Sequence, residues 1–194
     1  KIGIIGFGYV GKAMYKFFKG YYELRIYDPF LTTNEYCEFT LSSQEQINEC
    51  DIAFVCVPTN TQANGSCDTS VVYDTLMWLK TPLIVIKSTV IPGTTDLLSL
   101  DTGKRIVFSP EYCGESSYWT PYKFHTDIKE TPFFIFGGNK EDTTEVVDFF
   151  LHVTGPVKTY RQTSAKAAEM AKYMENTFYA TKIIYCYEIA EICD

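Results

Sequence analysis

A glycine-rich segment near the start of the chain constrains the fold more than any other feature of the sequence. Residues 6–11 read G-F-G-Y-V-G, which is the spacing G-x-G-x-x-G, and they follow a short run rich in isoleucine at 2–5. Residues 9–18 then carry apolar side chains at helical spacing. The sequence therefore predicts a strand, a tight turn and a helix in direct succession, which is how many α/β folds begin.

Each glycine of this segment has a separate purpose in a dinucleotide-binding turn. The first, Gly6, allows the tight turn, the second, Gly8, lets a pyrophosphate approach the backbone, and the third, Gly11, lets helix and strand pack closely. Tyr9 and Val10 open the helix, whose free N–H groups and positive dipole end face the phosphates. Phosphate binding at such a turn needs no basic side chain.

An acid follows at the distance that the same fold requires. Asp28 ends the second predicted strand, 22 residues after Gly6. A carboxylate at this place accepts hydrogen bonds from the ribose hydroxyls of NAD and repels the 2′-phosphate of NADP. The sequence thus predicts NAD as the cofactor. The alternative is that the glycines only form a turn and that Asp28 only caps a loop.

Strand-like and helical segments alternate along the rest of the chain. One strand, at 51–57, is almost entirely apolar, as expected for a parallel sheet that helices cover on both faces. We expect an α/β fold with a Rossmann-like, doubly wound, mainly parallel sheet. The further strands are expected at 24–27, 83–86, 105–108 and 133–136, with an edge strand at 157–160, and the further helices at 69–79 and 141–151.

The C-terminal segment differs from the rest. Residues 164–193 contain no glycine or proline and repeat apolar side chains every three or four positions, which predicts one long helix. This helix is longer than packing on a single sheet requires. We therefore expect an NAD-binding domain at 1–162 and a connecting or dimerisation helix at 163–194, with a homodimer formed through that helix.

Composition excludes several classes of protein. The net charge of −7 argues against a nucleic-acid partner, and no apolar run approaches the ~18–20 residues that a membrane span needs. No signal peptide is visible, and the seven cysteines show no C-x-x-C pair, so we expect reduced thiols and a cytoplasmic location. Two histidines in separate segments do not suggest a metal site.

Five segments together resemble the UDP-glucose/GDP-mannose dehydrogenases, a family of NAD-dependent nucleotide-sugar 6-dehydrogenases. The most specific are K-S-T-V-I-P-G-T-T at 87–95 and S-P-E-Y at 109–112, because a generic Rossmann domain requires neither. The five segments, which span nearly the whole chain, are residues 6–11, 57–59 with 68–71, 87–95, 109–112 with Glu115, and the C-terminal helix with Lys172, Asn176 and Glu188.

The resemblance implies a four-electron reaction in which NAD oxidises the C6 alcohol of a UDP-sugar, as in the conversion of UDP-glucose to UDP-glucuronate for polysaccharide biosynthesis. It also implies a catalytic cysteine in a glycine-rich segment of a second domain. No such segment is present in these 194 residues. We therefore expect that the C-terminal substrate domain is absent and that this chain alone is inactive.

The residues that match the family's motifs can be given roles. Thr89 and Glu111 follow the ends of predicted strands, where ligands bind in an open α/β sheet. Lys172 and Asn176 share one helix face and could stabilise a developing oxyanion. The expected catalytic residues are thus Thr89, Glu111, Lys172 and Asn176, and the expected cofactor-binding residues are Gly6, Gly8, Tyr9, Val10, Gly11, Asp28, Val57, Pro58, Thr59, Ser88, Thr89 and Glu115.

Two points stay open. Cys113 and Gly114 depart from the residues usual in the family's sugar-contacting loop, so the identity of the sugar is open, and we expect that Cys113 is not a nucleophile. Two other functions also fit the pattern. One is a β-hydroxyacid dehydrogenase, which also pairs a Rossmann domain with a helix-borne lysine and asparagine, and the other is a non-catalytic NAD-binding or dimerisation module.

Overall fold

A seven-stranded sheet forms the centre of the molecule in a computed structural model that describes residues 1–32, 39–113 and 127–193. The strand order is β2-β1-β3-β4-β5-β6-β7, and every neighbouring pair is parallel except β5 and β6. This confirms the expected Rossmann-like, mainly parallel sheet. The strands are β1 (Ile2–Ile5), β2 (Leu24–Tyr27), β3 (Ile52–Val55), β4 (Leu83–Ile86), β5 (Ile106–Phe108), β6 (Phe133–Gly137) and β7 (Thr159–Thr163).

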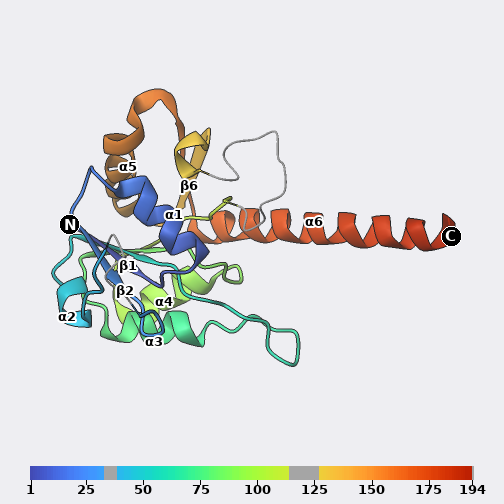
Figure 1. The fold of residues 1–194 in the computed structure, drawn as a ribbon, viewed down its shortest axis with the longest axis horizontal. Coiled ribbons are helices and arrows are strands. Elements are labelled where there is room, and N and C mark those ends of the chain that lie inside the picture. The colour runs from blue at the N-terminus through green and yellow to red at the C-terminus, as the bar shows by residue number, and fades with distance from the viewer. Residues whose placement is uncertain (33–38, 114–126, 194) are drawn as a thin grey trace.

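Helices cover both faces of this sheet (Figure 1). One face packs against α1 (Tyr9–Phe18) and α5 (Lys140–Thr154), through a core rich in phenylalanine. The other face packs against α2 (Gln44–Ile47), α3 (Ser70–Trp78), α4 (Thr94–Thr102) and the first turns of α6 (Ala165–Cys193). Strands β1, β3 and β4 are buried along their whole length, as the apolar pattern of the sequence predicts.

The structure differs from the expected elements at several places. Helices α2 and α4 were not expected, the third strand is shorter than 51–57, and the last strand spans Thr159–Thr163 rather than 157–160. Strand β7 lies at the edge of the sheet, so its polar side chains are solvated and give no apolar signal. Helix α4 exposes two of its leucines, Leu97 and Leu100, which obscures its periodicity.

Helix α6 extends from the α/β body as a single rod, as Figure 1 shows. Its buried residues are Ala165, Ala168 and Glu169, all in the first two turns, whereas its C-terminal half is exposed. Large apolar side chains on the exposed part include Phe178, Ile183 and Ile184. Among the described residues, no helix is both long and apolar enough to cross a membrane.

Candidate active site

The principal cavity, of about 810 Å³, lies at the carboxyl ends of the parallel strands and against one side of α6. Loops that follow β1 to β5 form its floor and walls, as expected for a ligand site in an open α/β sheet. Most of the residues expected from the sequence line this one cavity. They are Gly6, Gly8, Tyr9, Val10, Asp28, Val57, Pro58, Thr59, Ser88, Thr89, Glu111, Lys172 and Asn176.

Two expected residues stand apart from this set. Gly11 lies behind the turn, where an added Cβ would come within 2.0 Å of the Gly6 carbonyl oxygen. This contact explains the third glycine as a packing requirement between α1 and the turn after β1. Glu115 lies outside the residues that the structure describes.

The glycine turn is shaped to admit a ligand. Gly6 adopts a φ of +83°, a conformation that favours glycine. Gly8 is the N-cap of α1 and has ordinary extended backbone, and a Cβ added there would meet no protein atom within 4 Å. The space in front of Gly8 is therefore open, and the N–H groups of the first turn of α1 border it. This is the geometry that a pyrophosphate requires.

Asp28 joins the glycine turn to the loop after β2. Its Oδ2 accepts a hydrogen bond from the Phe7 N–H at 2.7 Å, and its Oδ1 accepts one from the Phe30 N–H at 2.9 Å. The carboxylate thus lies at the mouth of the cavity with both oxygens oriented by backbone amides. Acceptor positions on these oxygens that the amides do not occupy can receive ribose hydroxyl groups.

Hydroxyl groups link the loops after β3 and β4. The Thr59 hydroxyl donates to the Thr89 carbonyl at 2.7 Å, and the Ser88 hydroxyl donates to the Val57 carbonyl at the same distance. These two side chains therefore hold the cavity wall together through backbone atoms. The Thr89 side chain makes no hydrogen bond to another described residue, which leaves its hydroxyl available to a ligand.

A buried ion pair lies at the floor of the cavity. Lys87 Nζ is 3.2 Å from Glu111 Oε2, and the two side chains are only 2% and 8% exposed. The same ammonium donates to the Ser109 hydroxyl and to the Pro110 carbonyl, both at 3.2 Å. Lys87 thus bridges the ends of β4 and β5 and fixes one oxygen of Glu111.

Backbone amides fix the other oxygen of Glu111. Its Oε1 accepts hydrogen bonds from the N–H groups of Tyr112 at 2.8 Å and Cys113 at 2.9 Å. All of its contacts in the described structure are donated to it, so Glu111 acts here as an acceptor. This arrangement suits a carboxylate that orients a water molecule or a hydroxyl group.

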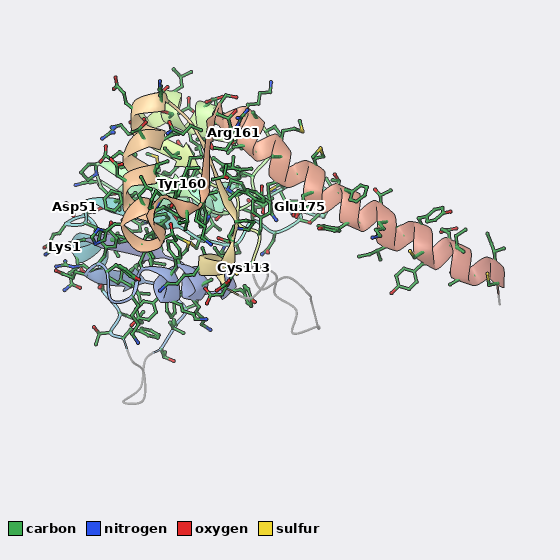
Figure 2. The ribbon with its side chains drawn as sticks, turned by 90° about the horizontal axis from the view of Figure 1, so that it is seen from above. Lys1, Asp51, Cys113, Tyr160, Arg161 and Glu175 are labelled. Carbon is green, nitrogen blue, oxygen red and sulfur yellow. The ribbon has the colours of Figure 1, made fainter. Side chains whose placement is uncertain are left out.

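Helix α6 supplies the opposite wall of the cavity. Lys172 and Asn176 both line the cavity, as their shared helix face predicts. Lys172 Nζ lies 2.9 Å from Glu175 Oε2 and 5.0 Å from the centre of the Tyr112 ring. Figure 2 shows Glu175 at the point where α6 leaves the α/β body.

Several residues of the cavity were not expected from the sequence. Lys87 belongs to the K-S-T segment, but its partner Glu111 comes from the next strand and could be assigned only from the sheet topology. Glu175 could have been found from its position one turn after Lys172. Among the residues that the structure describes, the additional lining residues are Phe30, Cys56, Asn60, Lys87, Tyr112, Cys113, Glu175 and Tyr179.

Two thiols near the floor of the cavity are poorly suited to nucleophilic attack. Burial raises the pKa of Cys56 to about 12, and burial with a contribution from Glu111 raises the pKa of Cys113 to about 11. A thiol reacts as the thiolate, so both are unreactive near neutral pH. This supports the expectation that Cys113 is not a nucleophile.

The raised pKa values of Cys56 and Cys113 predict a strong pH dependence of thiol labelling. In the folded chain at pH 8, iodoacetamide should label the exposed Cys186 and Cys193 well before Cys56 and Cys113. Labelling of Cys113 should rise about tenfold per pH unit until the pH approaches its pKa, because the thiolate fraction rises in this way. Mass-spectrometric mapping over time measures the four rates. Rapid labelling of Cys113 at pH 7 in the intact enzyme that carries this chain, with loss of NAD-dependent activity in step, would contradict this view.

The residues present fit NAD. The open space at Gly8, the amides of α1 and the oriented carboxylate of Asp28 match a pyrophosphate and a ribose in that order. Within the described ranges, no group of three or more histidine, cysteine or acidic side chains could hold a metal ion.

Comparison with known families decides the assignment. Residues 26–154 match the model of the UDP-glucose/GDP-mannose dehydrogenase family, NAD binding domain. The chain belongs to this family. Its cofactor is accordingly NAD, and it carries the NAD-binding domain of a nucleotide-sugar dehydrogenase.

Individual relatives of this family differ in the sugar that their names give. The chain is 26% identical over 172 residues to a UDP-glucose 6-dehydrogenase of Rickettsia bellii, covering 83% of this chain and 38% of that protein. It is 32% identical over 185 residues to a UDP-N-acetyl-D-mannosamine dehydrogenase of Methanococcus maripaludis, covering 89% and 42%. The chain thus spans about two fifths of the length of these relatives.

A solved structure shows the same fold. The UDP-glucose dehydrogenase of Pyrobaculum islandicum superposes with a TM-score of 0.76 at 23% identity, over 97% of this chain and 51% of that one.

Proposed function

We propose that this chain is the NAD-binding part of an enzyme that oxidises the C6 alcohol of a UDP-sugar to a carboxylate, as in the conversion of UDP-glucose to UDP-glucuronate. One observation carries the proposal. Thr89, Glu111, Lys172 and Asn176 line the same cavity as the glycine turn and Asp28, although they come from three separate parts of the sequence. Family membership favours this reaction over a β-hydroxyacid dehydrogenase and over a non-catalytic module.

The residues have distinct roles in the proposed reaction. The glycine turn and Asp28 hold NAD, which accepts hydride when bound. Lys172 and Asn176 donate hydrogen bonds to the C6 oxygen and stabilise negative charge that develops on it. Glu111, fixed by Lys87, accepts a hydrogen bond from a water molecule or hydroxyl group near the same atom. Thr89 contributes a free hydroxyl to this end of the cavity.

Cofactor selectivity tests the proposal. Isothermal titration calorimetry should show that the chain binds NAD more tightly than NADP, because the Asp28 carboxylate repels a 2′-phosphate. Asp28→Asn keeps one carbonyl acceptor for the loop amides but removes the charge, so the preference for NAD should fall by about tenfold, or ~1.4 kcal/mol. Asp101→Asn, which makes the same change at an exposed position of α4, should leave the preference intact.

One result would contradict the proposed NAD site, and another would contradict the expectation that this chain alone is inactive. Absence of NAD binding, or a preference for NADP, would contradict the assigned role of the glycine turn and Asp28. We further expect that residues 1–194 alone do not oxidise UDP-glucose, since no segment matches that of the family's catalytic cysteine. Turnover of UDP-glucose by these residues would contradict that expectation.

We also propose a homodimer through α6, with residues 1–162 as the NAD-binding domain and 163–194 as the dimerisation helix of a cytoplasmic enzyme of polysaccharide biosynthesis. The exposed apolar side chains of α6 support it, among them Phe178, Ile183, Ile184 and Ile192 at 56–79% exposure.

Sedimentation velocity should show a dimer, and Ile183→Glu with Ile184→Glu should give a monomer with unchanged NAD affinity. Lys182→Glu, at a neighbouring exposed position, is the matched charge control. A monomeric wild-type chain that binds little hydrophobic dye would contradict the dimer.

A further inference from the structure

The principal cavity has two walls from distant parts of the sequence. One wall is the segment after β4 that bears Thr89, and the other is α6, which bears Lys172 and Asn176. The proposed chemistry needs side chains of both walls at the same substrate atom. Their relative position therefore depends on whatever joins α6 to the segment after β4.

A buried carboxylate makes this junction. Glu169 of α6 has no exposed surface. Its Oε1 accepts hydrogen bonds from the Thr95 N–H at 2.8 Å and the Thr95 hydroxyl at 2.6 Å, and its Oε2 accepts one from the Gly93 N–H at 2.5 Å. Gly93 and Thr95 begin α4, only a few residues after Thr89.

The N-terminus of helix α4, rather than a cationic side chain, stabilises the negative charge of Glu169. Among the described residues no lysine, arginine or histidine lies within 4.0 Å of its carboxylate. The N-cap of α4 is Gly93, which has no side chain and adopts a φ of +100°. Glu169 thus supplies, from 74 residues away, the cap and the negative charge that the N-terminus of α4 favours.

Small residues set the distance between α6 and the sheet. A Cβ added at Gly137 of β6 would come within 2.6 Å of the Ala168 Cβ and 2.8 Å of the Ala165 Cα, so the first turn of α6 already lies as close as the backbones allow. After Glu169, every described residue of α6 is at least partly exposed. The orientation of the part that carries Lys172 is therefore set at Ala165, Ala168 and Glu169.

We infer that Glu169 is a positioning residue of the active site. It fixes α6 against the N-terminus of α4, and so holds Lys172 and Asn176 at the distance from Thr89 that the reaction requires. Lys172 and Asn176 follow Glu169 by three and seven residues, so both lie on its side of the helix. The catalytic part of this inference rests on the proposed function, whereas the junction itself does not.

The test compares Glu169→Gln and Glu169→Ala with the wild type in the intact enzyme that carries this chain. Glutamine keeps the size of the side chain but turns an amide N–H₂ group toward either Gly93 or Thr95, so that a donor faces a donor. Glu191→Gln is the matched control, because it makes the same change at an exposed position of the same helix.

Two measurements separate positioning from general stability. We expect kcat for the nucleotide sugar to fall by about 100-fold in Glu169→Gln, since a displacement of roughly 1 Å has this effect on a positioned catalytic group. The Kd for NAD should stay within about threefold, because the glycine turn and Asp28 lie outside the junction. Hydrogen exchange should become faster at residues 166–176 but not in β1 and β2.

Each outcome has a distinct meaning. Unchanged kcat in Glu169→Gln, or unchanged exchange at 166–176 in both variants, would overturn the inference. An equal loss of NAD affinity and kcat would also overturn it, since this would indicate a general effect on folding. A wild-type enzyme that binds NAD but oxidises no nucleotide sugar would instead refute the proposed function, and faster exchange at 166–176 would still support the junction.

Discussion

Replacing Gly11 with alanine is expected to destabilise the domain by about 3 kcal/mol, the upper part of the range for overpacking, and to weaken NAD binding with it. The added Cβ would lie 2.0 Å from the Gly6 carbonyl oxygen and 3.0 Å from its carbon. Both atoms belong to the backbone of the turn after β1, so no flexible side chain can move away. Either the turn or the start of α1 must shift. Urea unfolding and calorimetry with NAD measure the two effects.

Gly8→Ala is the matched comparison. A Cβ at Gly8 meets no protein atom within 4 Å, and its φ of −72° suits any residue, so the free energy of unfolding should change little. NAD affinity should nevertheless fall by about tenfold or more, because the methyl group would occupy space that the pyrophosphate needs. Equal stability of the Gly8 and Gly11 variants would contradict the packing role of Gly11. Full NAD affinity in the Gly8 variant would contradict the proposed pyrophosphate site.

Replacing Lys87 with methionine is expected to cost about 3–5 kcal/mol of folding stability, because it leaves the Glu111 carboxylate buried without its cation. Lys87 is 2% exposed and lies 3.2 Å from Glu111 Oε2, so water cannot readily take its place. The loss should also release one oxygen of Glu111 and lower kcat for the nucleotide sugar. Denaturant unfolding and steady-state kinetics measure the stability and the rate.

Two controls sharpen this prediction. Lys182→Met removes a lysine from an exposed position of α6 and should change stability by less than about 0.5 kcal/mol. The double variant Lys87→Met with Glu111→Leu removes both charges, so it should regain most of the lost stability while remaining inactive. If the single Lys87 variant were as stable as the wild type, the ion pair would have no structural role. If the double variant were active, Glu111 would have no role in the reaction.

Much of the fold could be predicted from local patterns. The helix at 9–18 and the strands at 24–27 and 83–86 were predicted at the bounds that the structure has, because apolar periodicity and turn residues coincide there. The short helix α2 was missed although a signal was present. Ser43 and Gln46 form a capping box, in which each side chain bonds the backbone of the other.

Helix α4 could not be predicted in the same way. Its N-cap is a glycine and its first turn is capped by Glu169, which lies in another helix more than 70 residues later in the chain. The pairing of Lys87 with Glu111 is of the same kind, since it joins the ends of two neighbouring strands. Motifs in the sequence identified most of the polar residues of the site. Which of these residues contact one another depends on the order of the strands and helices in the fold.

The antiparallel junction in the sheet has a consequence for how the chain folds. Strands β5 and β6 pair in register at a single position, Phe108 with Gly137, whereas β6 and β7 pair along their whole length. The first turns of α6 contact both β5 and β6 and lie directly on Gly137. Docking of α6 therefore covers the junction between β5 and β6, which has the fewest paired residues in the sheet. The same docking brings Lys172 and Asn176 to the cavity. A chain in which α6 is undocked has no assembled site, so local opening of α6 removes the site even while the rest of the sheet stays folded.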